Sequence, residues 1–123
     1  MSEPNISTLS QELKLNAVMP LIVNYISDCF IALDDEGHIL FANEKLLTVL
    51  GYTVKEFKYK KFLDYLDHND LQRTIEAFEK SKTTGSLGEF INSYKHKEGH
   101  YIRIKWRQSF SLHGLTFGLA EPA

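Results

Sequence analysis

The segment Phe30-Ile-Ala-Leu-Asp-Asp-Glu-Gly-His-Ile-Leu-Phe-Ala-Asn43 decides the fold of this chain. Two short β-prone runs, 29–33 and 38–42, flank the turn-forming residues 34–37. Runs of this kind around an Asp and Gly turn predict a β-hairpin, because glycine adopts the positive φ that tight turns need. Asn43 then offers a side-chain acceptor to the first turn of a helix that we expect over 44–50.

Helical signals continue after this hairpin. Thr53 and Glu56 have the spacing of a capping box, which predicts a second short helix. Leu71, Ile75 and Phe78 share one face of a longer helix. Three β-strands are expected to follow, at 89–97, 101–112 and 115–120. This order predicts an α+β fold, with a five-stranded antiparallel sheet and short helices packed on one face.

The expected strand 101–112 alternates between two faces. Its even-numbered residues, from Ile102 to Leu112, are mostly apolar, and its odd-numbered residues, from Arg103 to Ser111, are polar. Because successive side chains of a strand point to opposite faces, we expect the even-numbered set to face the core along the whole strand.

A flanking segment precedes the predicted domain. Residues 1–26 are expected to form an N-terminal helical segment, in which Leu9, Leu13 and Ala17 share one stripe and Pro20 kinks or ends the helix. The domain itself is expected to cover residues 27–121.

Composition excludes several classes of function. The 123 residues carry a net charge of −2, so no strong basic field favours nucleic acid, and Lys and Arg clusters are interpreted as solvated surface. The longest apolar stretch, 17–23, is far short of the roughly 20 residues of a membrane span. One cysteine rules out an internal disulfide and suits a reducing compartment, so we expect a cytoplasmic location.

In this order, the motifs resemble those of a PAS domain. The hairpin segment is similar to the family's first hairpin, and the resemblance extends over about residues 27–120. Three further segments resemble family motifs: Leu50-Gly-Tyr-Thr with Glu56-Phe57, Leu66-Asp-His-Asn-Asp70, and Lys97-Glu-Gly-His-Tyr-Ile102. The resemblance implies a sensory or signalling module that binds a small ligand in an internal cavity or mediates protein association. It also implies an output domain or partner outside this chain, as in two-component or cyclic-dinucleotide signalling.

Alternation and resemblance together suggest which residues line such a cavity. Asn92 and Tyr94 are the most informative, because inward polar groups need partners. The expected lining consists of Phe78, Asn92, Tyr94, Ile104, Trp106 and Ala120. Core packing is the simpler interpretation of the apolar members of this set.

The resemblance leaves the cofactor unknown, and an absent cofactor is the simplest expectation. The photoactive LOV subtype is not matched, since Lys60 stands where its reactive cysteine would be, and Cys29 is interpreted as a small core residue. A non-covalent flavin remains open through Trp106 and Asn92, and haem remains open through His68, which otherwise is an exposed residue at a helix start. The other histidines fall in or beside turns, and no pair is expected to have metal-ligand spacing.

Two further expectations concern association and catalysis. In the last strand the resemblance places Thr116, Gly118 and Ala120 inward. Leu115, Phe117 and Leu119 then face outward and need a cover, which the N-terminal helix of the same chain or of a second subunit would supply. We therefore expect a homodimer. An enzyme of a small cone-shaped fold that uses a buried carboxylate is the alternative, but the carboxylates cluster in expected turns and helix starts, so no catalytic residue is assigned.

Overall fold

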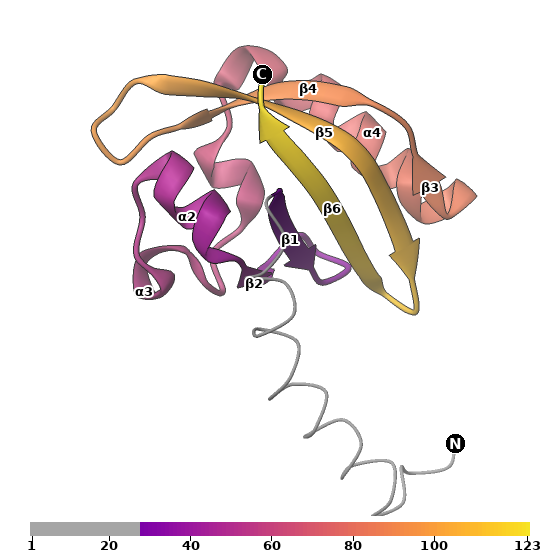
Figure 1. Ribbon diagram of the computed structural model, residues 1–123. Coiled ribbons are helices and arrows are strands. Elements are labelled where there is room, and N and C mark those ends of the chain that lie inside the picture. Colours follow the sequence, from indigo (N-terminus) through magenta and orange to yellow (C-terminus); the bar gives the residue numbers. More distant parts are fainter. Residues whose placement is uncertain (1–27) are drawn as a thin grey trace, which may run out of the picture.

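The computed structural model describes residues 28–123, which form one antiparallel sheet with helices gathered on one face (Figure 1). The expected N-terminal helix, with Leu9, Leu13 and Ala17, lies outside the described residues. The elements are β1 (Cys29–Leu33), β2 (Ile39–Ala42), α2 (Glu44–Leu50), α3 (Val54–Phe57), the 3-10 helices η1 (Phe62–Tyr65) and η2 (His68–Asp70), α4 (Leu71–Thr84), β3 (Ser86–Leu87), β4 (Phe90–Lys95), β5 (Tyr101–Leu112) and β6 (Leu115–Pro122). The sheet order is β2-β1-β6-β5, and both β3 and β4 pair with β5. The α+β architecture predicted from the sequence is therefore confirmed.

The predicted β1–β2 hairpin is present, and side-chain caps hold it. Asp34 Oδ1 accepts hydrogen bonds from the N–H groups of Glu36 and His38, at 2.9 and 2.8 Å. Gly37 has a φ of 86°, which explains why the turn needs glycine. Asn43 then links the hairpin to α2, because its Oδ1 accepts from Phe30 N at 3.0 Å and from Leu46 N at 3.1 Å.

The sheet has one strand more than expected. Ser86 and Leu87 form a two-residue strand that pairs with Phe110 and Ser109 of β5. Too short and too polar to show alternation, this strand leaves no pattern in the sequence.

A β-bulge makes part of the expected β5 pattern wrong. The pairing of β5 with β6 shifts between Trp106 and Gln108, so that one extra residue lies on β5. Before the bulge Ile104 and Trp106 are buried as expected. Beyond it the faces are exchanged: Phe110 is 38% exposed and Ser111 turns toward the helix side. The extra residue inverts the alternation because side chains have a period of two along a strand.

The last strand has the expected faces. Thr116, Gly118 and Ala120 are buried beneath the sheet, and the residues between them lie on its outer face. There Phe117 contacts the rings of Phe30 and Phe110, with centroid distances of 6.1 and 5.2 Å. The outer face thus carries a second apolar cluster of Phe30, Ala32, Phe41, Phe117 and Leu119, apart from the main core.

Among the described helices, none is long and apolar enough to cross a membrane.

Candidate functional site

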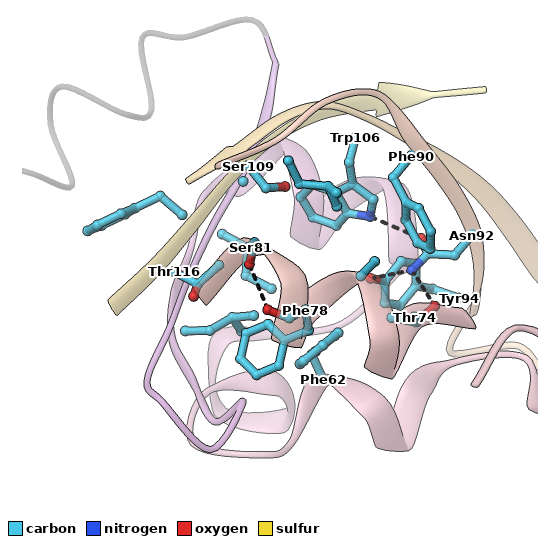
Figure 2. Close-up of a pocket in the computed structure, with 16 residues that line it drawn as sticks. Phe62, Thr74, Phe78, Ser81, Phe90, Asn92, Tyr94, Trp106, Ser109 and Thr116 are labelled. Atoms are coloured by element: carbon cyan, nitrogen blue, oxygen red, sulfur yellow. Dashed lines mark hydrogen bonds between the residues drawn. The ribbon is translucent and has the colours of Figure 1, made fainter. Parts of the chain in front are cut away.

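A small cavity lies between the sheet and α4 (Figure 2). Its volume is about 60 Å³. Strands β1, β3, β4, β5 and β6 supply one wall, and α4 with η1 supplies the other. Residues that line it include Phe62, Thr74, Phe78, Ser81, Phe90, Asn92, Tyr94, Trp106, Ser109 and Thr116. Rings and aliphatic groups dominate this surface, and the polar groups gather at two places.

The first polar group is centred on Asn92, which is 2% exposed. Its Oδ1 accepts a hydrogen bond from Trp106 Nε1 at 3.0 Å. Its Nδ2 donates to Tyr94 OH at 3.2 Å and to Thr74 Oγ1 at 3.3 Å. Burial raises the pKa of the Tyr94 hydroxyl far above its usual range, so this phenol stays protonated and serves as a neutral hydrogen-bonding group.

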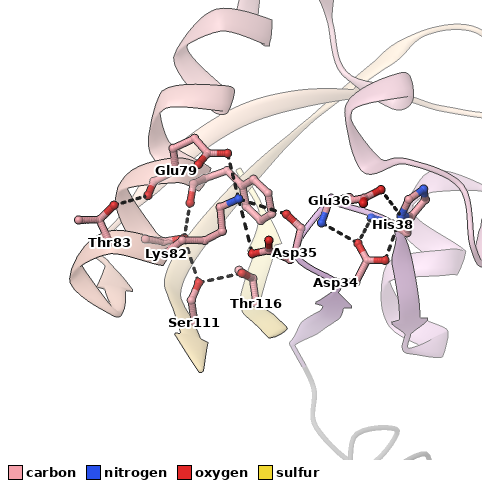
Figure 3. Close-up of polar contacts among 11 residues, drawn as sticks. Asp34, Asp35, Glu36, His38, Glu79, Lys82, Thr83, Ser111 and Thr116 are labelled. Atoms are coloured by element: carbon pink, nitrogen blue, oxygen red, sulfur yellow. Dashed lines mark hydrogen bonds and ion pairs between the residues drawn. The ribbon is translucent and has the colours of Figure 1, made fainter. Parts of the chain in front are cut away.

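The second polar group is a row of hydroxyls at the other end of the cavity. Ser81 Oγ donates to Phe78 O at 2.8 Å and lies 3.2 Å from Ser111 Oγ. Ser111 Oγ in turn lies 2.7 Å from Thr116 Oγ1 (Figure 3). Each hydroxyl therefore has a partner inside the protein.

This row separates the cavity from a polar hollow of about 120 Å³, which Thr116 and Ser111 also line. Lys82 lies over the hollow, where its Nζ is 3.0 Å from Glu79 and 3.7 Å from Asp35 (Figure 3). These contacts join the end of α4 to the β1–β2 turn. The hollow side of the hydroxyl row is thus charged, whereas the cavity side is neutral.

The structure brings together four of the six expected lining residues. Phe78, Asn92, Tyr94 and Trp106 line the cavity. Ile104 and Ala120 are wholly buried in the core, but they do not line it. The indole of Trp106 packs against Gly118, where an added Cβ would be 2.8 Å from the ring atoms Cε3 and Cζ3. Gly118 is therefore needed for space.

Thr74 and Ser81 are cavity residues that the sequence reasoning missed. They are the buried residues of α4, and Phe78 between them packs its ring edge-on against Phe62, at a centroid distance of 5.3 Å. Residues 74, 78 and 81 share one helix face. The sequence does contain a signal for these two cavity residues, since both are small hydroxyl residues on the helix face that carries Phe78.

The dimensions of the cavity do not fit haem or a flavin ring. A volume of about 60 Å³ holds roughly four to six water-sized groups. His68 is exposed on η2 and does not line the cavity, so it is not placed to ligate iron there. Cys29 is fully buried on β1, and burial raises the pKa of its thiol to about 11, which favours the unreactive form.

One expectation about the histidines is wrong. His96 and His100 flank the β4–β5 turn, and with Glu98 they place possible ligand atoms within 4.8 Å of one another. Ligand spacing along a single helix or strand gives no sign of this group, because it is the tight hairpin that brings residues four apart face to face.

Comparison with known proteins identifies the family. The model of the PAS fold matches residues 39–112, which is more than half of the chain. The chain belongs to the PAS fold family. The resemblance noted from the sequence is thereby confirmed, and no curated protein sequence matches this PAS domain.

Solved structures show the same fold at low sequence identity. A PAS domain from Colwellia psychrerythraea has a TM-score of 0.72 and 19% identity, over 94% of this chain and 96% of that one. A domain of a sensory box sensor histidine kinase/response regulator from Geobacter sulfurreducens has a TM-score of 0.69 and 18% identity, over 98% and 99%. The PAS domain of the Cronobacter turicensis quorum-sensing receptor RpfR, in complex with BDSF, has a TM-score of 0.68 and 12% identity, over 79% and 94%. PAS relatives are thus sensory modules, and some of them bind ligands.

Proposed function

We propose that this PAS domain is a sensory module that binds a small neutral molecule in the cavity between the sheet and α4. The observation that carries the proposal is the Asn92 network, which places an amide, an indole N–H and two hydroxyls at one end of a mainly apolar cavity. Ligand sites commonly combine apolar walls with a few convergent polar groups. The structural relative solved with BDSF supports the proposal by analogy of fold.

Size and charge restrict the ligand class. The cavity admits a body of only a handful of non-hydrogen atoms. Among the described residues, those that line it include no Asp, Glu, Lys or Arg, so an ionised ligand would be buried without a counter-charge. A short apolar molecule with one hydroxyl or amide group fits both conditions, with that group near Asn92 or Thr74.

We assign no catalysis to this chain and place the output elsewhere. A base catalyst would need a carboxylate at the cavity, and the described lining contains none. The relative from a sensor histidine kinase supports an output domain or signalling partner as the receiver of the signal. The cytoplasm, where the single thiol remains reduced, is the location that goes with this role.

The test uses Trp106 as a reporter, because it is the only tryptophan of the chain. Its indole N–H signal is followed by 1H–15N NMR while 1-butanol, butyramide, butyrate or butylammonium is added. We expect saturable shifts with the two neutral probes and none with the two ions. If neither neutral probe shifts the indole signal, the proposal is wrong.

Paired variants on α4 control for effects outside the cavity. Ala77 lines the cavity, so Ala77→Leu fills it and should abolish the shifts. Thr83 is exposed on the same helix, so Thr83→Leu adds bulk outside the cavity and should leave them unchanged. Equal responses of the two variants would contradict binding in the cavity.

A second proposal concerns association. The outer face of the sheet carries Phe30, Phe41, Phe110 and Phe117, and Phe110 remains 38% exposed. We propose that a second copy of the chain covers this face, with an N-terminal segment that supplies the stripe of residues 9, 13 and 17. Apolar patches of this kind on a sheet commonly mark an interface.

Light scattering tests this homodimer. The chain of residues 1–123 should have the mass of a dimer at micromolar concentration, and Phe117→Gln should shift it to a monomer. Tyr101→Gln removes an aromatic side chain that is 48% exposed on the same strand β5, and it should leave the mass unchanged. A monomeric mass of the unmodified chain would refute the proposal.

A further inference from the structure

The β4–β5 turn carries three possible metal ligands side by side. His96 and His100 pair across the turn, since His96 N donates to His100 O at 2.7 Å. Their imidazole rings stack, with centroids 4.4 Å apart and an angle of 19° between the planes. Glu98 lies between them in sequence, and one ligand atom from each of the three residues lies within 4.8 Å of the others.

The turn is held in place by the rest of the domain. Lys97 N donates to Leu50 O at 3.0 Å, which joins the turn to the end of α2. Tyr52 OH donates to Lys95 O at 2.6 Å just before the turn. The Lys97 ammonium also forms an ion pair with Glu56. These ties fix the backbone that carries the ligands, which lowers the ordering cost of binding.

The ring of His96 has a fixed position for a further reason. It lies against Gly51, where a Cβ would be 2.6 Å from Cε1 and 2.7 Å from Nε2 of the imidazole. Any other residue at 51 would therefore push the ring away. Gly51 also has a φ of 82°, as the left-handed end of α2.

We propose that His96, Glu98 and His100 form a binding site for a late first-row divalent metal ion, with Zn²⁺ as the cellular occupant. Two imidazoles and one carboxylate are ligands that Zn²⁺ favours, whereas Mg²⁺ and Ca²⁺ require mainly oxygen. Three protein ligands leave a fourth position for water or for an atom of a partner. The site lies at the turn, outside the cavity, so it is independent of the ligand proposed above.

Binding requires the ring of His100 to turn out of the stack, because the nitrogen lone pairs of two stacked imidazoles do not converge on one ion. Ligand atoms about 2.1 Å from a tetrahedral ion lie about 3.4 Å apart, so atoms now within 4.8 Å must approach one another by up to about 1.4 Å. Glu98 and His100 are exposed, and their side chains have room to turn. His96 Nδ1 accepts from Glu98 N at 3.0 Å, and binding through either ring nitrogen replaces this hydrogen bond. The metal bonds must outweigh that loss.

Calorimetry tests the site on the chain of residues 1–123 after treatment with a chelator. Titration with ZnCl₂ at neutral pH should give one ion per chain, and MgCl₂ should give no binding. His96→Ala and His100→Ala should each weaken Zn²⁺ binding by about tenfold or more. His113→Ala removes a histidine from the β5–β6 turn, at the opposite end of β5, and should leave the affinity unchanged.

Each remaining outcome counts against the site. No saturable Zn²⁺ binding, or an affinity in His100→Ala equal to that of the unmodified chain, would refute it. Equal losses in His113→Ala and His100→Ala would indicate adventitious binding to exposed histidines only. Circular dichroism of the variants, together with imidazole 1H–13C NMR shifts of the unmodified chain on addition of ZnCl₂, separates a lost ligand from a lost fold.

Discussion

Replacing Asn92 by alanine tests whether the polar network stabilises the domain. The change removes the acceptor of Trp106 Nε1 and the donor to Tyr94 and Thr74. The indole N–H, in a side chain that is 6% exposed, then has no partner. A buried donor left without an acceptor costs about 1–3 kcal/mol, and each lost hydrogen bond to a hydroxyl adds about 0.5–1.5 kcal/mol at most.

Because the two hydroxyls can rotate toward other partners, we expect a total loss of about 2–4 kcal/mol in the free energy of unfolding. For a domain of about 100 residues this corresponds to a fall in Tm of about 10–20 °C. Ser93→Ala is the matched control, since Ser93 follows on the same strand with its side chain on the opposite face. It should change the free energy of unfolding by about 0.5 kcal/mol or less.

Urea denaturation of four proteins measures the coupling: the unmodified chain, Asn92→Ala, Trp106→Phe and the double variant. Trp106→Phe keeps an aromatic ring but removes the N–H. We expect the two changes to be non-additive by about 1 kcal/mol or more, because they share one hydrogen bond. Losses that simply add, or a loss below about 1 kcal/mol in Asn92→Ala, would show that water satisfies the indole and would refute the reasoning.

Three further predictions concern packing, thiol reactivity and pH. Gly118→Ala should destabilise the domain by about 1–3 kcal/mol and shift the fluorescence of Trp106, because its Cβ would be 2.8 Å from the indole, whereas Gly88→Ala, with open space around it, should change neither. Cys29 should resist a disulfide reagent at pH 8 until the protein unfolds, since burial raises its pKa to about 11; fast labelling of the native state would contradict this. Burial acts to raise the pKa of Asp34, but hydrogen bonds from His38 and from the Glu36 N–H lower it more, so this pKa lies below its usual value. The ionised Asp34 carboxylate should therefore stabilise the folded domain fully above the unfolded pKa near 3.9. This contribution should disappear as the pH falls through the folded pKa. The difference in stability from Asp34→Asn should shrink between pH 6 and pH 3, and a constant difference would show that the charge contributes nothing.

The features that the sequence predicts well are local ones. Asp34 and Asn43 act on backbone groups a few residues away, and their residue types are selected for that geometry. Tyr94 and Trp106 could be placed at a cavity because alternation holds on the strand before the bulge. Short-range rules were enough for these residues.

Features that depend on distant pairing were not predictable. No glycine or proline marks the bulge after Trp106, because it arises from the register between β5 and β6. Thr74 looks like an ordinary polar helix residue until Asn92, 18 positions away, gives it a partner. His96 and His100 become neighbours only when the turn between them is known.

Because of the bulge, the single strand β5 places aromatic side chains on both faces of the sheet. The ring of Trp106 lies in the interior, whereas the ring of Phe110, four residues later in the strand, lies on the outer face. A strand in perfect register would have sent both rings to the same side. A displacement of the indole by a cavity ligand therefore has a direct covalent route, through the backbone of a single strand, to the surface where a second copy would dock.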